Sequence, residues 1–267
     1  MKTAIVHDWF ENYAGSERVV ESFTNTWPEA DIFALVDFLG DNDRKIILKG
    51  KRTKNSFIQN FPGAKNHFRN YIALFPYAVE QFDLTDYNLV LSSSHSFIKG
   101  IMTDSNQLHI CYCHSPIRYV WDFYWRYLKD EKLDRGLKGT IAKSVLHYIR
   151  IWDKNTAERP DFLIANSNHI ANRIKKIYGR NSTVIYPPVD VNKFENVSDK
   201  DNYYVTASRM VPYKRIDLIV QAFSQMPDKK LVVIGDGPEL KKIKALASKN
   251  IEILGYQSDE NLKKYLQ

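Results

Sequence analysis

The sequence contains 267 residues, of which 44% are hydrophobic and 26% are charged, and its formal net charge is +7. This length suits one large domain or two ordinary ones with packed cores. No apolar run reaches the ~20 residues that a transmembrane helix needs, and the N-terminus becomes charged too early for a signal peptide. The two cysteines, Cys111 and Cys113, are too few for a zinc site and too close for a disulfide framework, so we expect small buried residues of a cytoplasmic protein.

The chain opens with an expected strand over Lys2–Val6, followed by Asp8, a loop and a helix over Glu17–Trp27. In the loop, Gly15 permits close approach of the backbone or a positive φ, and Ser16 is expected to cap the helix. The loop lacks the G-x-G-x-x-G pattern of dinucleotide-binding folds, which argues against an ordinary NAD enzyme. A simple capped turn is the alternative to a ligand-binding loop here.

A basic segment follows two further expected strands, Asp31–Val36 and Lys45–Leu48. Eight Lys and Arg lie between Arg44 and Arg69, and no Asp or Glu occurs from Arg44 through Val79. Subtracting these eight from the 38 basic residues leaves 30 against 31 acidic ones, so the whole charge excess lies in this segment. Interleaved aromatic residues favour an anionic membrane surface or a lipid-phosphate acceptor as its partner. A solvated face is the alternative, and nucleic acid is the less favoured partner.

Strands are also expected over Tyr87–Leu91 and Leu108–Cys113, and the second runs directly into His114. A histidine at the carboxyl end of a central strand, before a proline-marked turn, is well placed to face a ligand. A lone histidine is nevertheless more often structural. The helix expected over Leu137–Trp152 has one apolar face, which we interpret as packing on the sheet, with a membrane-surface helix as the less favoured alternative.

Two consecutive prolines, Pro187 and Pro188, interrupt the last strand pattern of this half and predict a linker over Tyr186–Phe194. The expected domains are therefore residues 1–188 and 189–267. In the second domain, strands over Tyr203–Ser208 and Leu231–Ile234 flank a helical pattern. Strand, helix and strand in this order predict a parallel βαβ unit.

Cations lie where this βαβ unit would bind an anion. Arg209 follows the first strand, and Lys214 and Arg215 are expected in the first turn of the helix. Positive charges there oppose the helix dipole, and phosphates favour helix N-termini at the carboxyl edge of parallel sheets. The pattern predicts a diphosphate held by Arg209 and Lys214, with a solvated basic loop as the alternative.

Two strings in this half, S-R-M-V-P-Y-K-R-I-D-L-I-V and V-I-G-D-G-P-E-L, resemble the donor-binding half of the retaining glycosyltransferases of family 4. The string C-Y-C-H-S-P-I-R-Y-V-W-D is similar to the segment in which this family places an active-site histidine. The resemblance is closest to the mannosyltransferase-like branch of bacterial surface polysaccharide assembly. It implies the α/β GT-B fold of two Rossmann-like doubly wound domains, the second of which is incomplete here because family members continue further.

The resemblance also implies an activity, which is the transfer of a sugar from a nucleotide-diphosphate sugar to a glycan or lipid-linked acceptor. GDP-mannose is one candidate donor, and no metal is expected, because no convincing D-x-D motif occurs. The enzyme would work in the cytoplasm, at the inner membrane face. A truncated, inactive fragment that binds the acceptor or the membrane is the alternative. The residues implied are His114 as the catalytic residue, Gly15, Arg209, Lys214, Gly235, Gly237 and Tyr256 for the donor, and Asp8, Ser16, Glu17 and Arg118 on the acceptor side.

Overall fold

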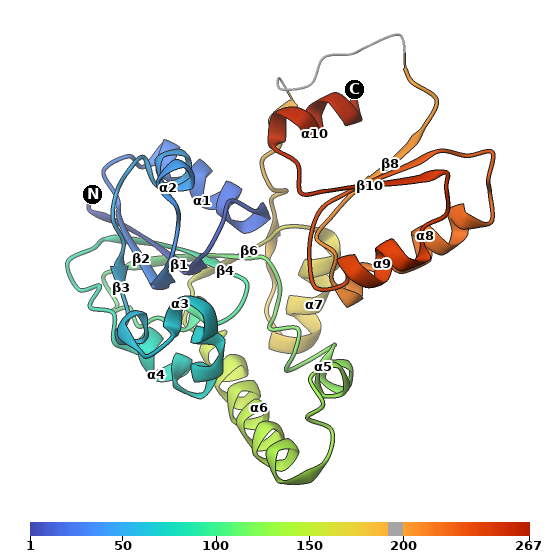
Figure 1. The fold of residues 1–267 in the computed structure, drawn as a ribbon. Coiled ribbons are helices and arrows are strands. Elements are labelled where there is room, and N and C mark those ends of the chain that lie inside the picture. The colour runs from blue at the N-terminus through green and yellow to red at the C-terminus, as the bar shows by residue number, and fades with distance from the viewer. Residues whose placement is uncertain (192–199) are drawn as a thin grey trace. The chain divides into compact units, whose positions relative to one another are not determined.

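The computed structural model describes residues 1–191 and 200–267. The chain divides into two compact units, Met1–Pro188 and Val189–Gln267, each with its own sheet (Figure 1). The expected linker Tyr186–Phe194 is described only as far as residue 191, and its last three residues lie outside the described part. Every strand pair in both sheets is parallel, which confirms the predicted α/β class.

The first unit holds a seven-stranded sheet in the order β3-β2-β1-β4-β5-β6-β7. Its strands are β1 (Thr3–Phe10), β2 (Asp31–Asp37), β3 (Lys54–Asn55), β4 (Leu89–Ser94), β5 (Leu108–Cys113), β6 (Phe162–Ala165) and β7 (Thr183–Val184). Its helices are α1 (Gly15–Thr26), α2 (Asp41–Leu48), α3 (Ala64–His67), α4 (Phe75–Glu80), α5 (Tyr124–Asp130), α6 (Gly136–Thr156) and α7 (Asn168–Tyr178). Short 3₁₀ turns are η1 (Phe57–Asn60), η2 (Phe68–Leu74) and η3 (Ile98–Gly100).

Helices cover both faces of this sheet. Successive residues of β1 point to opposite faces, so Val6 joins the core that contains Phe75 of α4. Its neighbour Ile5 joins a second core with Val20 of α1 and Ile47 of α2. The uninterrupted burial of β1 and β4 is what parallel strands covered on both faces require.

The strand expected over Lys45–Leu48 is wrong, because these residues form the last turn of α2. Asp41 and Asp43 in the first turn complement the helix dipole, and Ile47 and Leu48 are both fully buried. A short apolar run cannot be assigned to strand or helix by periodicity alone. By contrast, Cys111 and Cys113 lie buried on β5 as unpaired thiols, as expected.

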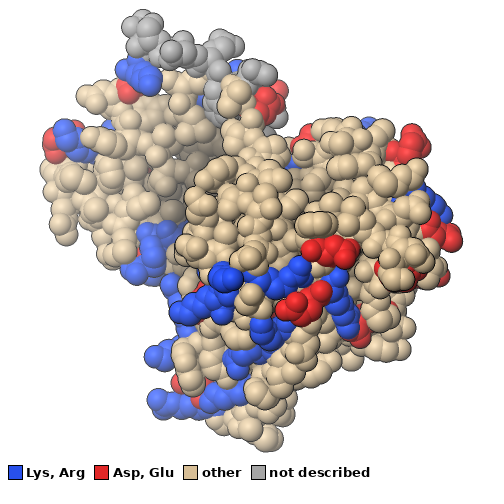
Figure 2. Space-filling view, turned by 180° about the vertical axis from the view of Figure 1, so that it is seen from behind, with Lys and Arg blue, Asp and Glu red and all other residues tan. Residues whose placement is uncertain are grey.

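Three of the eight cations of the basic segment are paired with acids that lie outside it in the sequence. Arg44 lies 2.6 Å from the Asp37 carboxylate, and Arg69 pairs with Glu11. Lys54 lies 3.2 Å from Asp31. The charge excess that this segment carries in the sequence is therefore partly offset in space by acids from other segments. On the face in Figure 2, Lys and Arg gather over the lower part of the first unit.

The second unit holds a three-stranded sheet in the order β10-β9-β8. Its elements are β8 (Tyr204–Ala207), η5 (Pro212–Lys214), α8 (Ile216–Ser224), β9 (Leu231–Ile234), α9 (Leu240–Leu246), β10 (Ile251–Gly255) and α10 (Asp259–Leu266). The expected βαβ unit is present, but α8 begins at Ile216 after a 3₁₀ turn. Lys214 and Arg215 thus precede the helix, and were wrongly expected in its first turn.

A buried ion pair joins η3 to α6 in the first unit. Lys99 Nζ contacts the Asp153 carboxylate, and neither side chain is more than 1% exposed. Trp121 Nε1 donates to Asp153 at 2.7 Å, and the Tyr178 hydroxyl lies 3.0 Å away. The carboxylate of α6 therefore binds η3, the segment that contains Trp121, and α7.

Replacing Asp153 by Ala should destabilise the first unit by roughly 3–5 kcal/mol, because the Lys99 ammonium is left buried without its counter-ion. Urea unfolding followed by tryptophan fluorescence measures this, since all five Trp residues lie in this unit. The double variant Lys99→Met/Asp153→Asn removes both charges and keeps an oxygen acceptor, so it should recover most of the loss. An Asp153→Ala unfolding midpoint equal to wild type would contradict the assignment.

Candidate functional site

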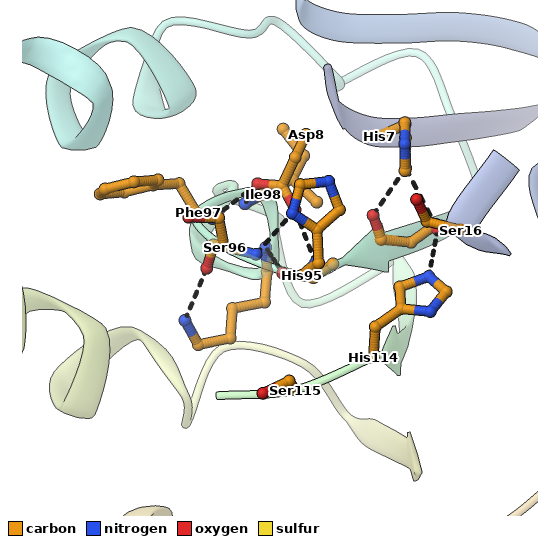
Figure 3. Close-up of polar contacts among 12 residues, drawn as sticks. His7, Asp8, Ser16, His95, Ser96, Phe97, Ile98, His114 and Ser115 are labelled. Atoms are coloured by element: carbon orange, nitrogen blue, oxygen red, sulfur yellow. Dashed lines mark hydrogen bonds and ion pairs between the residues drawn. The ribbon is translucent and has the colours of Figure 1, made fainter. Parts of the chain in front are cut away.

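His7 and His114 lie at the carboxyl edge of the first sheet (Figure 3). Both are hydrogen-bonded to Ser93. Strands β1, β4 and β5 are consecutive in the sheet and parallel, so their carboxyl ends lie at one edge. His7 is the register partner of Ser93, and His114 follows β5 directly. The sheet itself therefore brings together residues that are far apart in the sequence.

His7 is fully buried and links helix α1 to strand β4. Its Nδ1 lies 2.9 Å from the Ser93 carbonyl oxygen and 3.2 Å from Ser93 Oγ. A carbonyl oxygen only accepts, so Nδ1 carries a proton and donates it. Nε2 faces the Glu17 carboxylate at 3.6 Å. Burial opposes ionisation of Glu17, but His7 and the Ser16 hydroxyl outweigh it and lower the pKa of Glu17 to about 2.

His114 is held by the same serine, with its Nε2 2.9 Å from Ser93 Oγ. Burial, together with the nearby His95 and His7, lowers the pKa of His114 to about 3, so the ring is neutral near pH 7. Ser93 Oγ lies within reach of the Nδ1–H of His7 and can donate its own hydrogen to Nε2 of His114. We therefore assign the proton of His114 to Nδ1, for which no described residue provides a hydrogen-bond partner.

Asp8 organises the loop after β4 rather than facing outward. Its carboxylate is fully buried and accepts four backbone N–H bonds of 2.6–2.9 Å, from His95, Ser96, Phe97 and Ile98 (Figure 3). Burial alone would raise the pKa of Asp8, but His95, His7 and these amides hold it below its usual range. These four hydrogen bonds fix the backbone of His95, whose ring lies against Trp9 at a ring-centroid distance of 4.4 Å.

The start of α1 differs from the expectation in one respect. The helix begins at Gly15 after Ala14, and no side chain caps it, so Ser16 is not its cap. The Ser16 hydroxyl instead donates to Glu17 at 2.9 Å. Gly15 is exposed, and a Cβ added to it would meet nothing within 4 Å. The N-cap residue Ala14 therefore leaves the first N–H groups of α1 without a side-chain cap, and the Glu17 carboxylate accepts from the backbone N–H of Glu17 itself.

The segment after His114 is fixed by α7. Arg173 contacts Ser115 Oγ and pairs with Asp122. Arg118 is exposed between these anchors. Asp122 is thus held by an ion pair, whereas Arg118 remains available to a ligand.

In the second unit, the loops that follow the three strands are hydrogen-bonded to one another. The backbone N–H of Ser208 donates to the carbonyl oxygen of Ile234, and that of Met210 donates to the carbonyl oxygen of Asp236. The N–H of Gly235 donates to the carbonyl oxygen of Gly255, and all three N···O distances are 2.8–3.0 Å. Gly235 and Gly237 have φ of +132° and +153°, and a Cβ on either would overlap the backbone carbonyl oxygen of Ser208 or Met210.

Glycine is therefore required at both positions, and the contact places the Arg209 loop against the Gly235–Gly237 turn. Arg209, Lys214 and Tyr256 are all exposed. Tyr256 directly follows Gly255, so the structure brings the five residues predicted for the donor in this unit to one carboxyl edge.

The three cations of this unit are not equivalent. Arg215 adopts a left-handed φ of 53° and binds Asp217 through two bonds of 3.0 and 3.3 Å. The hydrogen bond that Arg215 donates to Asp217 raises the pKa of Arg215. Lys242 adds a second cation 3.5 Å from Asp217. Asp217 therefore neutralises Arg215, whereas the structure describes no acidic partner for the exposed Arg209 or Lys214.

The sequence analysis overlooked His7, Ser93 and His95 as site residues. The rule that selected His114, a polar side chain at the carboxyl end of a strand, applies equally to them. Among the described residues, no group of three or more His, Cys, Asp or Glu is arranged to hold a metal ion.

Comparison with sequence families supports one class of protein for both units. The profile of Glycosyltransferase Family 4 matches residues 13–193, and that of Glycosyl transferases group 1 matches residues 189–267. No curated protein matches the chain.

Solved structures share the fold at low sequence identity. Alr3699/HepE of Anabaena in complex with UDP has a TM-score of 0.63 and 15% identity, over 97% of this chain and 70% of that one. Sucrose-phosphate synthase of Thermosynechococcus elongatus has the same score and identity, over 99% and 73%. A mutant of S. aureus TarM in complex with Fondaparinux, alpha-GlcNAc-glycerol and UDP has a TM-score of 0.58 and 13% identity, over 96% and 78%. These likenesses establish the GT-B fold.

The lowered pKa of His114 should make stability depend on pH. The unfolded chain protonates this histidine below about pH 6.5, whereas the folded chain leaves it neutral, so the free energy of unfolding falls as the pH drops. Between about pH 7.5 and pH 5.5, His114→Gln should lose roughly 1 kcal/mol less stability than wild type. Urea unfolding at the two pH values measures this. His147→Gln, at an exposed position of α6, is the control, and equal losses in wild type and His114→Gln would contradict a neutral His114.

Proposed function

Because the chain belongs to glycosyltransferase family 4, we propose that it transfers a sugar from a nucleoside-diphosphate donor to a hydroxyl group of a glycan or lipid-linked acceptor. The observation that carries the donor site is the carboxyl edge of the second unit, where Arg209 and Lys214 are exposed beside a turn that requires Gly235 and Gly237. A non-catalytic binding module is not favoured, since both matching profiles are those of glycosyltransferases.

Arg209 and Lys214 bind the diphosphate in this proposal. Glycosyl transfer leaves negative charge on the departing diphosphate, and fixed cations stabilise that charge as it develops. The Gly235–Gly237 turn lets a phosphate approach the backbone, and the exposed Tyr256 ring offers a face to the base. In the first unit, the uncapped start of α1 at Gly15 offers N–H groups to an anion.

His114 acts on the sugar through its Nδ1–H, which donates to a hydroxyl group of the transferred ring. A neutral donor suits this task because a hydroxyl carries no charge. Ser93, His7 and Glu17 position this histidine and fix its tautomer, and Asp8 positions the adjoining loop. Arg118 and the half-buried Ser16 are proposed on the acceptor side.

The donor proposed first is a UDP-sugar, since the solved structures of HepE and TarM contain UDP. GDP-mannose, which the sequence resemblance suggests, is tested beside it. Retention of the anomeric configuration is part of the proposal and is read from the first-formed product by NMR.

Nucleotide binding tests the donor site directly. Arg209→Ala and Lys214→Ala should each weaken binding of UDP about tenfold, because a hydrogen bond to a charged group contributes roughly 1.5–3 kcal/mol. Arg215→Ala is the matched control and should weaken binding less than about threefold, because Asp217 already holds its guanidinium. Calorimetry with UDP and with GDP measures all three. If Arg215→Ala has the largest effect, or if neither nucleotide binds the wild-type chain, the assignment fails.

The positioning of His114 can be separated from a purely structural role. Ser93→Ala removes the hydrogen bond to Nε2, so kcat for sugar transfer or donor hydrolysis should fall about tenfold at unchanged UDP affinity. Ser92→Ala is the control, because Ser92 makes a similar buried bond of 2.8 Å to His109. It should cost stability and leave kcat unchanged. Equal effects of the two variants on kcat would refute the role of Ser93, and no turnover with UDP-glucose or GDP-mannose would refute the proposed activity.

A further inference from the structure

Helix α6 carries apolar side chains on both of its faces. Leu146 and Ile149 point inward and are buried in the main core. On the outward face, Leu137 and Ile141 are 78% and 56% exposed, and Tyr148 and Ile151 continue the same stripe with about half of each side chain exposed. The spacing of four, seven and three residues keeps these side chains on one side of the helix.

A helix that only packs on a sheet has a polar outer face. None of the described helices combines the length and apolarity needed to cross a bilayer. The outer stripe of α6 therefore has no explanation within the described fold.

The charges around this stripe are basic. No Asp or Glu occurs from Arg135 through Trp152, and residues 124–152 contain seven Lys and Arg against three Asp and Glu. Lys132, Arg135 and Lys138 are exposed at the turn between α5 and α6. Trp125 of α5 is 69% exposed at the same end of the unit, where Figure 2 shows Lys and Arg gathered near the bottom of the view.

We propose that the hairpin of α5 and α6 docks on an anionic lipid bilayer. The outer stripe of α6 enters the boundary between headgroups and acyl chains, Trp125 lies at the headgroup level, and exposed lysines meet lipid phosphates. The partner is anionic lipid because exposed apolar side chains ringed by cations match a surface that is apolar within and negative outside. Arg126 and Arg135 of the hairpin pair with Asp130 and Asp134, so its exposed Lys129, Lys132 and Lys138 are the cations proposed to meet lipid. The segment from Arg44 to Arg69 also has three cations paired with acids of the protein, but it lacks an exposed apolar stripe like that of α6.

Flotation of the full chain with phosphatidylglycerol-containing vesicles and with pure phosphatidylcholine vesicles tests the proposal. Wild type should be captured by the anionic vesicles and less by the neutral ones, and capture should fall with salt. Ile141→Glu should reduce the partition coefficient between vesicles and water about tenfold. The substitution replaces an apolar side chain that enters the lipid by a negative charge that anionic lipid repels. Ile46→Glu is the matched control, since Ile46 is also an exposed isoleucine on a helix, α2, within the basic segment. It should leave capture unchanged.

Three outcomes would overturn the proposal. Loss of capture in Ile46→Glu but not in Ile141→Glu would return the lipid surface to the segment from Arg44 to Arg69. Equal capture by neutral vesicles, or no capture at all, would exclude anionic lipid. A dimer in sedimentation that Ile141→Glu dissociates, without vesicle binding, would assign the stripe to a second copy of this chain. Both isoleucines are exposed, so both variants should fold, which unfolding midpoints verify.

Discussion

The parallel pairing of β1, β4 and β5 is the constraint on which the first unit's site depends. It sets the register that places His7 beside Ser93 and leaves His114 one residue beyond β5. Asp8 then fixes the loop after β4, because one carboxylate accepts four backbone N–H bonds in a place that water does not reach. A buried charge is tolerated only when it is bonded in this way. The geometry of His114 thus follows from the order of strands and from one satisfied carboxylate.

Much of this arrangement could be predicted because strand ends and glycines carry local signals. The strand before His114 follows from a short stretch of sequence, whereas Gly235 and Gly237 were implied by the family resemblance, and the structure shows why glycine is required there. The helix over Lys45–Leu48 could not be separated from a strand, since three apolar residues fit both. The link from Glu17 through His7 and Ser93 to His114 was also beyond reach, because it depends on strand order, which one sequence does not specify.

The charge available at the protein surface was the property predicted least well from the sequence. The count of cations from Arg44 to Arg69 was correct, but three of the eight pair with Asp31, Asp37 and Glu11, which come from other segments. Ion pairing is a property of space, so a run of like charges in sequence is no measure of potential at a surface. The same holds for Arg215, which is adjacent to Lys214 in sequence but is neutralised by Asp217. Exposure and pairing together, rather than charge alone, select the cations available to a ligand.

The residues that we propose for donor binding differ in electrostatic character between the two units. The second unit offers Arg209 and Lys214, exposed cations suited to a diphosphate that gains negative charge. The first unit offers a neutral His114 above the buried carboxylates of Asp8 and Glu17. A sugar ring that loses its leaving group gains positive charge, and a protonated histidine beside it would oppose that change. In the proposed function, burial lowers the pKa of His114, so this histidine can offer the sugar a hydrogen-bond donor without adding a repulsive charge.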